Sequence, residues 1–322
     1  MGVLIDGVWR AQEELPQEIG PSGEFKRADS RFRDRISADG ATGFKAEAGR
    51  YHLYAAYGCP WAHRTLIYRA LKRLEGAISV AYSTGMDDEG WAFGTRPDLP
   101  ESTPDPVNGF HHLHQAYTAS DGHYTGKVTV PTLWDTHTRR IVNNESSDII
   151  RMLNSAFDHI ANDDTDFYPA PLRAEIDHVN DFVYERINNG VYRCGFARSQ
   201  AAYDAAYDTL FEALDELEAR LGRQRYLVGR QITEADWRLF PTLVRFDVAY
   251  FPLFKCNRQR IADYPNLSGY MRELYQVPGI AATVKPRHYI ANYWSIGRLN
   301  PTGIIPKGTP VDYTAPHDRA RL

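Results

Sequence analysis

Cysteine is scarce in this sequence, which has only three, Cys59, Cys194 and Cys256, among 322 residues. An odd and sparse set does not make a disulfide framework and is typical of a reducing compartment. Long hydrophobic runs are missing too: no stretch of about 18 apolar residues occurs, so we expect no membrane span. The N-terminus lacks a basic segment followed by an apolar run, so no secretory signal is expected. These absences predict a cytoplasmic protein.

Charge of one sign is also not in excess, because 41 acidic residues face 37 basic ones and the net charge is −4. No basic cluster is interleaved with aromatic residues, so neither nucleic acid nor an anionic membrane is expected as a partner. The chain is 43% hydrophobic and 24% charged, as ordinary globular proteins are. Its length allows one large domain or two of ordinary size.

The N-terminal half is predicted to contain a strand–helix–strand unit. Alternating residues predict a strand at 51–55, and apolar residues at helical spacing follow from Trp61 to a C-cap at Gly76. A second strand is predicted at 78–82, which implies parallel pairing through a right-handed crossover. The residues before this unit, 1–50, are charged and lack periodicity, and we expect an N-terminal extension that precedes or covers the domain.

Two strands and a helix complete this domain. Residues 83–127 are rich in Gly, Pro, Asp and His and predict a long loop, which in a compact domain is usually functional or disordered. A strand interrupted by a proline is predicted at 128–135, a short partner strand at 141–142, and a helix begins at 143–148. The order β-α-β, then β-β-α, is that of a thioredoxin-like domain. We predict this α/β domain over 51–155.

The C-terminal half has helical periodicity throughout and predicts an all-α domain over 165–299. Apolar residues three and four positions apart predict helices at 172–186, 203–222, 233–251 and 267–276. We expect a break at Gly195, and an N-cap at Thr233 supported by Asp236 three positions later. Pro and Gly recur every few residues in 300–322, which should be an irregular tail.

The strongest chemical signal is Cys59, in Gly58-Cys59-Pro60-Trp61 between the predicted strand and helix. A cysteine at a helix N-terminus faces unpaired backbone N–H groups and the positive end of the helix dipole, which favours the thiolate and lowers the pKa of the thiol. Ala62 stands where a dithiol redox protein has its second cysteine, so a mixed disulfide at Cys59 needs an external thiol to clear it. The alternative is a buried, inert cysteine, which the turn before a helix disfavours.

Two further features fit a thiol ligand. The Val130-Pro131 bond can be cis, which leaves the Val130 backbone free to pair with the peptide of a thiol; the alternative is an edge-strand proline. Glu145-Ser146 begins a predicted helix, whose N–H groups and Ser146 hydroxyl suit a carboxylate, while Glu145 suits an ammonium group. An α-amino acid head carries both groups. The alternative for this pair is an ordinary N-cap and first-turn acid.

The remaining candidates are tyrosines and histidines. Tyrosines are abundant in the helical half, where a phenol can bind the oxygens of an aromatic substrate, although most are expected to be packing residues. His111, His112 and His114 are close in sequence, but they lie in a predicted polar loop with no matching cysteine or acidic pair. We therefore expect no metal site.

These motifs, in this order, resemble the glutathionyl-hydroquinone reductases, the Xi-class relatives of the glutathione transferases. The resemblance covers nearly the whole chain and rests on the segments 57–62, 128–135, 143–146, 190–197 and 300–306. It implies a thioredoxin-like N-terminal domain, an all-α C-terminal domain of the glutathione-transferase type and a homodimer. It implies no tightly bound cofactor, with glutathione as the cosubstrate.

The resemblance also implies a reaction on a small-molecule hydroquinone conjugate. The Cys59 thiolate attacks the sulfur of a glutathionyl-hydroquinone and releases the hydroquinone, and a second glutathione clears the Cys59–glutathione disulfide. Tyr192 is assigned to catalysis with Cys59, and Tyr250 and Tyr293 to the hydroquinone. The implied glutathione contacts are Trp91, Lys127, Val128, Thr129, Val130, Glu145 and Ser146.

Two departures from the family pattern keep alternatives open. Lys127 stands where relatives often have Arg, and the thiol can then be mycothiol in place of glutathione. In 288–293 the usual adjacent tyrosine pair is missing, so Tyr289 can take the place of Tyr293. Two other functions fit the same fold: a monothiol deglutathionylase of mixed disulfides, which uses Cys59 but not the tyrosines, and a thiol-binding protein without enzymatic activity.

Overall fold

The computed structural model describes residues 2–11, 13, 15, 18–308 and 311–322. The remaining positions belong to the predicted extension and the predicted tail, and those parts of both predictions lie outside the described residues. The chain forms two units, one of Met1–Glu18 with Arg27–Thr165 and one of Ile19–Lys26 with Asp166–Leu322.

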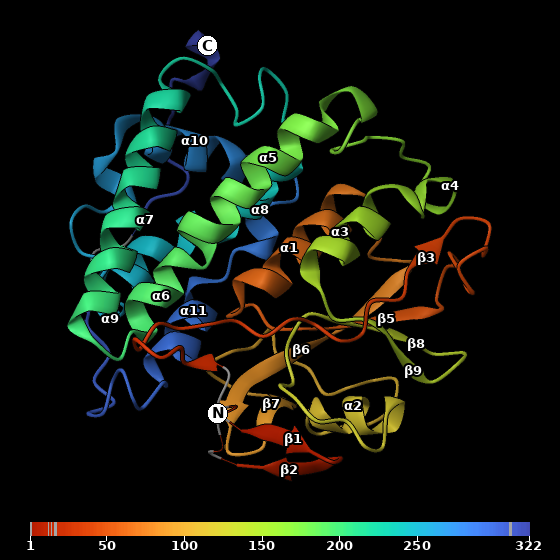
Figure 1. Ribbon diagram of the computed structural model, residues 1–322. Helices are drawn as coiled ribbons and strands as arrows, with labels where there is room; N and C mark the ends of the chain where they lie inside the picture. The colour runs from red at the N-terminus through yellow and green to blue at the C-terminus, as the bar shows by residue number, and fades with distance from the viewer. Residues whose placement is uncertain (1, 12, 14, 16–17, 309–310) are drawn as a thin grey trace. The chain divides into compact units, whose positions relative to one another are not determined.

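The first unit is built on a five-stranded mixed sheet with strand order β7-β6-β5-β8-β9 (Figure 1). Its strands are β5 (Tyr51–Ala55), β6 (Ile78–Asp87), β7 (Gly90–Phe93), β8 (Thr132–Asp135) and β9 (Arg140–Asn143). The central strand β5 pairs parallel with β6, as predicted, and antiparallel with β8. Every residue of β5 is buried, so the centre of the sheet lies in the core of this unit.

Helices cover both faces of the sheet: α1 (Pro60–Leu71) and α3 (Ser146–Ser155) lie together on one face and α2 (His114–Ser120) on the other (Figure 1). A short helix, α4 (Asp158–Ala161), follows α3. The predicted C-cap at Gly76 is wrong, because α1 ends at Leu71. The chain turns there through Arg73, which has a φ of 52°, and this early turn buries Leu74 completely.

Regular structure occurs before residue 51, inside the segment predicted as an extension without periodicity. Four short strands lie in it: β1 (Val3–Ile5), β2 (Val8–Arg10), β3 (Ile36–Ser37) and β4 (Phe44–Lys45). The β1–β2 hairpin turns at Asp6 and Gly7, whose φ angles are 48° and 74°. Asp-Gly between two apolar residue pairs is a strong hairpin signal. Buried Leu4 ties the hairpin to the unit, since it exchanges two backbone hydrogen bonds of 3.0 and 2.9 Å with Gly126.

The long loop predicted for 83–127 is wrong at 83–93 and 114–120, while 94–113 and 121–127 are turns and irregular structure. β6 continues to Asp87, turns through Asp88 and Glu89, and pairs antiparallel with β7; α2 follows at His114. The polar composition concealed this order because β7 is the edge strand of the sheet and its hairpin turn faces solvent.

The second unit is helical, as predicted. Its α-helices are α5 (Arg173–Val183), α6 (Gly190–Phe196), α7 (Gln200–Leu221), α8 (Glu234–Arg245), α9 (Phe251–Leu253), α10 (Pro265–Tyr275) and α11 (Pro286–Trp294). Two π-helical segments extend α5 and α8: η3 (Tyr184–Asn188) and η4 (Phe246–Tyr250).

Of two local predictions for this unit, one is confirmed and one is wrong. The predicted capping box is confirmed, since the Asp236 carboxylate accepts from the Thr233 N–H at 2.7 Å at the start of α8. The predicted break at Gly195 is wrong, because Gly195 lies inside α6. A Cβ at this position would approach the ring of Phe254 to 2.4 Å, so the glycine permits close packing and does not interrupt the helix.

The described residues after 300 are mostly irregular, but their end is anchored to the helical unit. Arg319 is fully buried, and its guanidinium donates to the carbonyl oxygens of Leu221 at 2.6 Å, Gln224 at 2.8 Å and Arg225 at 2.6 Å. Leu221 is the last residue of α7, where backbone acceptors have no helical partner, and Gln224 and Arg225 lie in the turn that follows.

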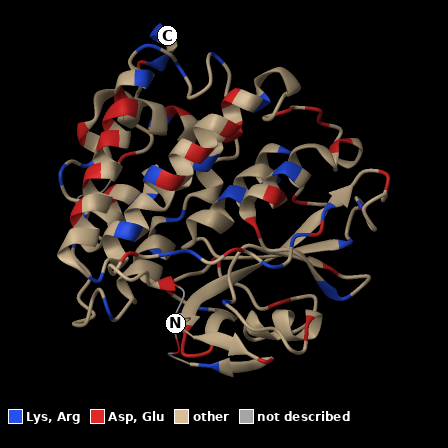
Figure 2. Ribbon diagram, viewed as in Figure 1, with Lys and Arg blue, Asp and Glu red and all other residues tan. Residues whose placement is uncertain are grey.

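Charged side chains of both signs are spread over each unit, and acidic residues recur along α7 (Figure 2). Among the described residues, no helix has both the length and the apolar character needed to cross a membrane.

Candidate active site

Cys59 is the N-cap residue of α1, directly after the strand β5. Pro60 occupies the first helical position, where its missing N–H leaves no hydrogen bond unmade. The Cys59 carbonyl accepts from the His63 N–H at 3.0 Å, as the first bond of the helix. The thiol is buried with a residue exposure of 7%, and it donates to the Val130 carbonyl oxygen at 3.4 Å. The structure therefore brings together two of the predicted site residues that are far apart in sequence.

The Val130-Pro131 peptide bond is cis and precedes β8. The loop before it is held by Tyr117 of α2, whose hydroxyl donates to the Thr129 carbonyl at 3.0 Å and accepts from the Thr129 N–H at 3.2 Å. Asn144 also donates to this hydroxyl, at 2.9 Å. Sequence reasoning missed Tyr117, which lies in the segment that we predict as a loop.

Glu145 is the N-cap of α3, and its carboxylate accepts from the Ser147 N–H at 3.0 Å. It also accepts from the hydroxyls of Ser147 at 3.0 Å and Ser30 at 3.1 Å. The adjacent Ser146 hydroxyl accepts from the guanidinium of Arg64 at 3.4 Å. A carboxylate and a hydroxyl with an arginine beside it thus lie at one helix start, the arrangement that an α-amino acid head requires.

Lys127 and Trp91 lie in different surroundings. The Lys127 ammonium pairs with the Glu18 carboxylate at 2.6 Å. Trp91 is buried on the edge strand β7, which β6 separates from β5, and its carbonyl accepts from the Leu113 N–H at 2.9 Å. The structure shows no arrangement that joins these two residues directly.

In the helical unit, three phenols form a hydrogen-bonded chain. The Tyr293 hydroxyl lies 2.8 Å from that of Tyr192 and 2.7 Å from that of Tyr250. Tyr250 and Tyr293 are buried, and burial raises the pKa of both well above the ordinary tyrosine value. Both phenols are therefore neutral and keep a proton to donate.

Comparison with known proteins adds a second line of evidence. Residues 58–156 match the family described as "Glutathione S-transferase, N-terminal domain", and residues 200–273 match "Glutathione S-transferase, C-terminal domain". The chain is 52% identical to glutathionyl-hydroquinone reductase PcpF of Sphingobium chlorophenolicum over 310 residues, which cover 96% of both chains. It is 49% identical to glutathionyl-hydroquinone reductase YqjG of Escherichia coli K12, over 99% of this chain and 98% of YqjG.

This chain belongs to the glutathionyl-hydroquinone reductase family. The glutathione-bound structure of YqjG superposes with a TM-score of 0.91 and covers both chains completely, with 47% identity. The Xi-class glutathione transferase of Natrialba magadii superposes with a TM-score of 0.92 and 42% identity, over 100% of this chain and 97% of the other. The predicted fold, a thioredoxin-like domain and an all-α domain of the glutathione-transferase type, is confirmed.

Tyr289 lies outside the phenol chain. The Arg245 guanidinium stacks over its ring at 3.9 Å from the centroid, and its hydroxyl accepts from the Lys285 N–H at 3.3 Å. Tyr289 and Tyr293 share α11, yet the structure brings only Tyr293 together with Tyr192 and Tyr250.

Sequence reasoning also missed two arginines that stack on the ring of Trp61. The guanidinium carbons of Arg27 and Arg64 lie 4.7 and 4.6 Å from the ring centroid of Trp61, two residues after Cys59. Arg64 is on α1, one turn beyond the helix start, and is buried. Positive charge near a helix-start thiol favours the thiolate. The signal in the sequence was the spacing of Trp61 and Arg64, at helical positions i and i+3.

Proposed function

We propose that this chain is a thiol-dependent reductase that removes glutathione from glutathionyl-hydroquinones through a mixed disulfide at Cys59. The observation that carries this proposal is the position of Cys59 as the N-cap of α1, with Ala62 in place of a second cysteine. Such a thiol attacks sulfur but has no neighbouring thiol to resolve the product. Membership of a family whose relatives are named glutathionyl-hydroquinone reductases supports the same reaction.

In the first half-reaction, the Cys59 thiolate attacks the glutathione sulfur of the conjugate. A sulfur–sulfur bond forms and the bond from sulfur to the aromatic ring breaks. The ring carbon keeps the electron pair of that bond and takes up a proton, so the hydroquinone leaves. The Tyr192–Tyr293–Tyr250 chain supplies phenol hydroxyls that hydrogen-bond the hydroquinone oxygens and hold them in place.

In the second half-reaction, the thiolate of another glutathione attacks the glutathione sulfur of the mixed disulfide. Glutathione disulfide forms, and the electron pair of the broken bond returns to Cys59 as a thiolate. Two glutathione sulfurs are thereby oxidised and one ring carbon is reduced, which balances the reaction.

The thiol ligand is proposed to bind in 51–155, the thiol-binding domain, while 165–299 is the substrate domain. The backbone of Val130 pairs with the peptide of the ligand, and the N–H of that peptide competes with the Cys59 thiol for the Val130 carbonyl. Glu145 and Ser146 hold the amino-acid head. The remaining proposed contacts are made by Trp91, Lys127, Val128 and Thr129. The Lys127 ammonium, which pairs with Glu18, also binds a carboxylate of the ligand.

The test is to mix the purified protein with glutathionyl-hydroquinone and excess glutathione and to measure free hydroquinone. We expect release by the wild type and none by Cys59→Ser, because serine is far less nucleophilic than a thiolate. Cys194→Ala is the matched control, since Cys194 is equally buried but lies within α6. It should retain release.

The same assay identifies the thiol. Release from the mycothiol conjugate with mycothiol, and none with glutathione, would assign mycothiol as the cosubstrate. No release by the wild type with either pair would contradict the proposed function. A homodimer and a cytoplasmic location, which the resemblance and the scarcity of cysteine favour, stay predictions.

A further inference from the structure

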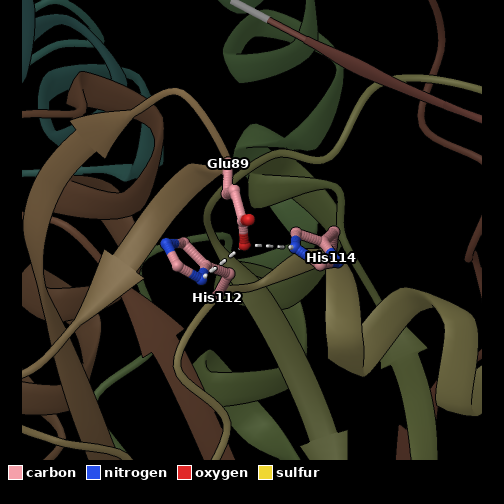
Figure 3. Close-up of side chains that lie close together, drawn as sticks. All are labelled: Glu89, His112 and His114. Carbon is pink, nitrogen blue, oxygen red and sulfur yellow. Dashed lines mark ion pairs between the residues drawn. The ribbon is translucent and has the colours of Figure 1, made fainter. Parts of the chain in front are cut away.

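Two histidines and a glutamate converge in the first unit, away from Cys59 in the sequence. Glu89 lies in the turn between β6 and β7, His112 precedes α2, and His114 begins it. Figure 3 shows the three side chains pointing toward one another. One Glu89 oxygen, Oε2, lies 3.3 Å from His112 Nδ1 and 3.8 Å from His114 Nε2. One ligand atom of each residue lies within 4.8 Å of the others.

Both ring nitrogens of His112 face carboxylates. Its Nε2 lies 3.0 Å from the Asp87 carboxylate, which can only accept, so this nitrogen carries the proton. The other nitrogen, Nδ1, lies 3.3 Å from the Glu89 carboxylate, so either a second proton or a cation bridges these two atoms. His114 Nε2 is buried and has no hydrogen-bond partner in the part of the chain that the structure describes, and it faces the same oxygen. A cation shared by the three atoms satisfies all of them.

We propose that Glu89, His112 and His114 bind one divalent transition-metal ion of the Zn²⁺ class, with water in the remaining position. Two imidazole nitrogens and a carboxylate oxygen are a donor set that suits zinc. Bonds of about 2.0–2.1 Å in tetrahedral geometry put neighbouring donors roughly 3.3 Å apart. The Glu89–His112 distance of 3.3 Å already has this value, and that of 3.8 Å to His114 needs a small closure. The Asp87 carboxylate contacts Nε2 of His112 and fixes the orientation of the ring. Carboxylates that do not touch the metal hold metal-bound histidines in the same way.

The surrounding structure holds these ligands in place. The His114 ring stacks against the ring of Trp9 on β2, with centroids 5.2 Å apart and an interplanar angle of 19°. The Trp9 indole N–H donates to the Asp88 carbonyl at 2.9 Å, in the same turn as Glu89. Gly90 has a φ of +92°, and a Cβ there would lie 3.0 Å from the Trp9 ring. The ion would fasten the β6–β7 turn to the start of α2.

The experiment measures Zn²⁺ binding to the full chain, without a tag, by titration calorimetry. The parent protein carries Cys59→Ser, so that the Cys59 thiol cannot bind the metal. We expect about one Zn²⁺ per chain, and a rise in the thermal unfolding midpoint with Zn²⁺. Glu89→Gln keeps the size of an exposed side chain and should abolish both effects, as should His114→Ala. Asp87→Asn should weaken binding by roughly 10–100-fold.

His111→Ala is the matched control, because His111 is exposed and adjacent in sequence but outside the cluster. It should bind Zn²⁺ like its parent. Absence of binding to the parent would overturn the proposal, with His112 then a protonated bridge between Asp87 and Glu89. Binding that survives both Glu89→Gln and His114→Ala would overturn it too, because the metal would lie elsewhere. Neither outcome bears on hydroquinone release.

Discussion

Burial alone does not distinguish the three cysteines. Cys59, Cys194 and Cys256 are 7%, 2% and 0% exposed. Only Cys59 lies at a helix start, where Pro60 follows it as the first helical residue. Cys256 is enclosed within the helical unit, where burial and the neighbouring Cys194 raise the pKa of its thiol well above the ordinary value. A thiol in that environment stays protonated and unreactive. The chemistry of a cysteine thus depends on its backbone position and local charge.

The phenol chain yields a prediction at the same scale. Tyr293→Phe removes the hydroxyl that lies between Tyr192 and Tyr250, so the hydroxyls of these two tyrosines lose their common hydrogen-bond partner. If these phenols position the hydroquinone and its protons, hydroquinone release should slow by about 10²-fold. Release rates at several conjugate concentrations measure the change in kcat and KM.

Tyr289→Phe is the control for this prediction. Tyr289 lies on the same helix and is equally buried, but its hydroxyl contacts the Lys285 backbone. We expect its kcat and KM to stay close to those of the wild type. Equal losses in both variants would show that α11 had been disturbed and that the phenol chain has no specific role.

At the scale of elements, the start of α8 depends on one buried carboxylate. Asp236 accepts from the N–H groups of Leu227 at 2.9 Å and Thr233 at 2.7 Å, and from the hydroxyl of Tyr270 at 2.7 Å. Asp236→Ala leaves these donors buried without an acceptor. We expect the free energy of unfolding to fall by about 3 kcal/mol or more, measured from urea unfolding. Asp208→Ala, an exposed acid on α7, should change it by less than about 0.5 kcal/mol.

At the scale of the whole molecule, His52 links stability to pH. It lies fully buried on the central strand β5, and burial lowers the pKa of its imidazole to about 4 from an ordinary 6.5, although the nearby Asp105 acts in the opposite direction. The unfolded chain therefore binds a proton at higher pH than the folded one. Below 6.5 the unfolded state gains this proton, so stability present at neutral pH is lost as pH falls toward 4.

From pH 7 to pH 5 this one group should lower the free energy of unfolding by about 2 kcal/mol. His52→Gln has no such proton to bind, so its urea midpoint should fall less over the same interval than that of the wild type. His111→Gln, at an exposed position, should follow the wild type. A His52→Gln protein with the full pH dependence would refute the assignment.

The sequence by itself determined the features that neighbours along the chain decide. The strand at 51–55, the turn into α1 with Cys59 at its start, the Thr233–Asp236 capping box and the helical character of the second unit all follow from short-range periodicity and capping. Such signals are local because they depend on which residues share one turn or one strand face. The edge hairpin β6–β7 was missed because its turn is polar and exposed and β7 has only four residues, too few to show a period.

Only the tertiary structure decided which distant side chains meet. Glu89 joins His112 and His114 because the β6–β7 hairpin and the bridge from Ala92 to His112 bring the two segments together. Tyr293 rather than Tyr289 joins the phenol chain because the two residues lie one turn apart along α11, where they meet different neighbours. Contacts of this kind depend on the packing of whole elements, and no pattern within a single segment specifies them.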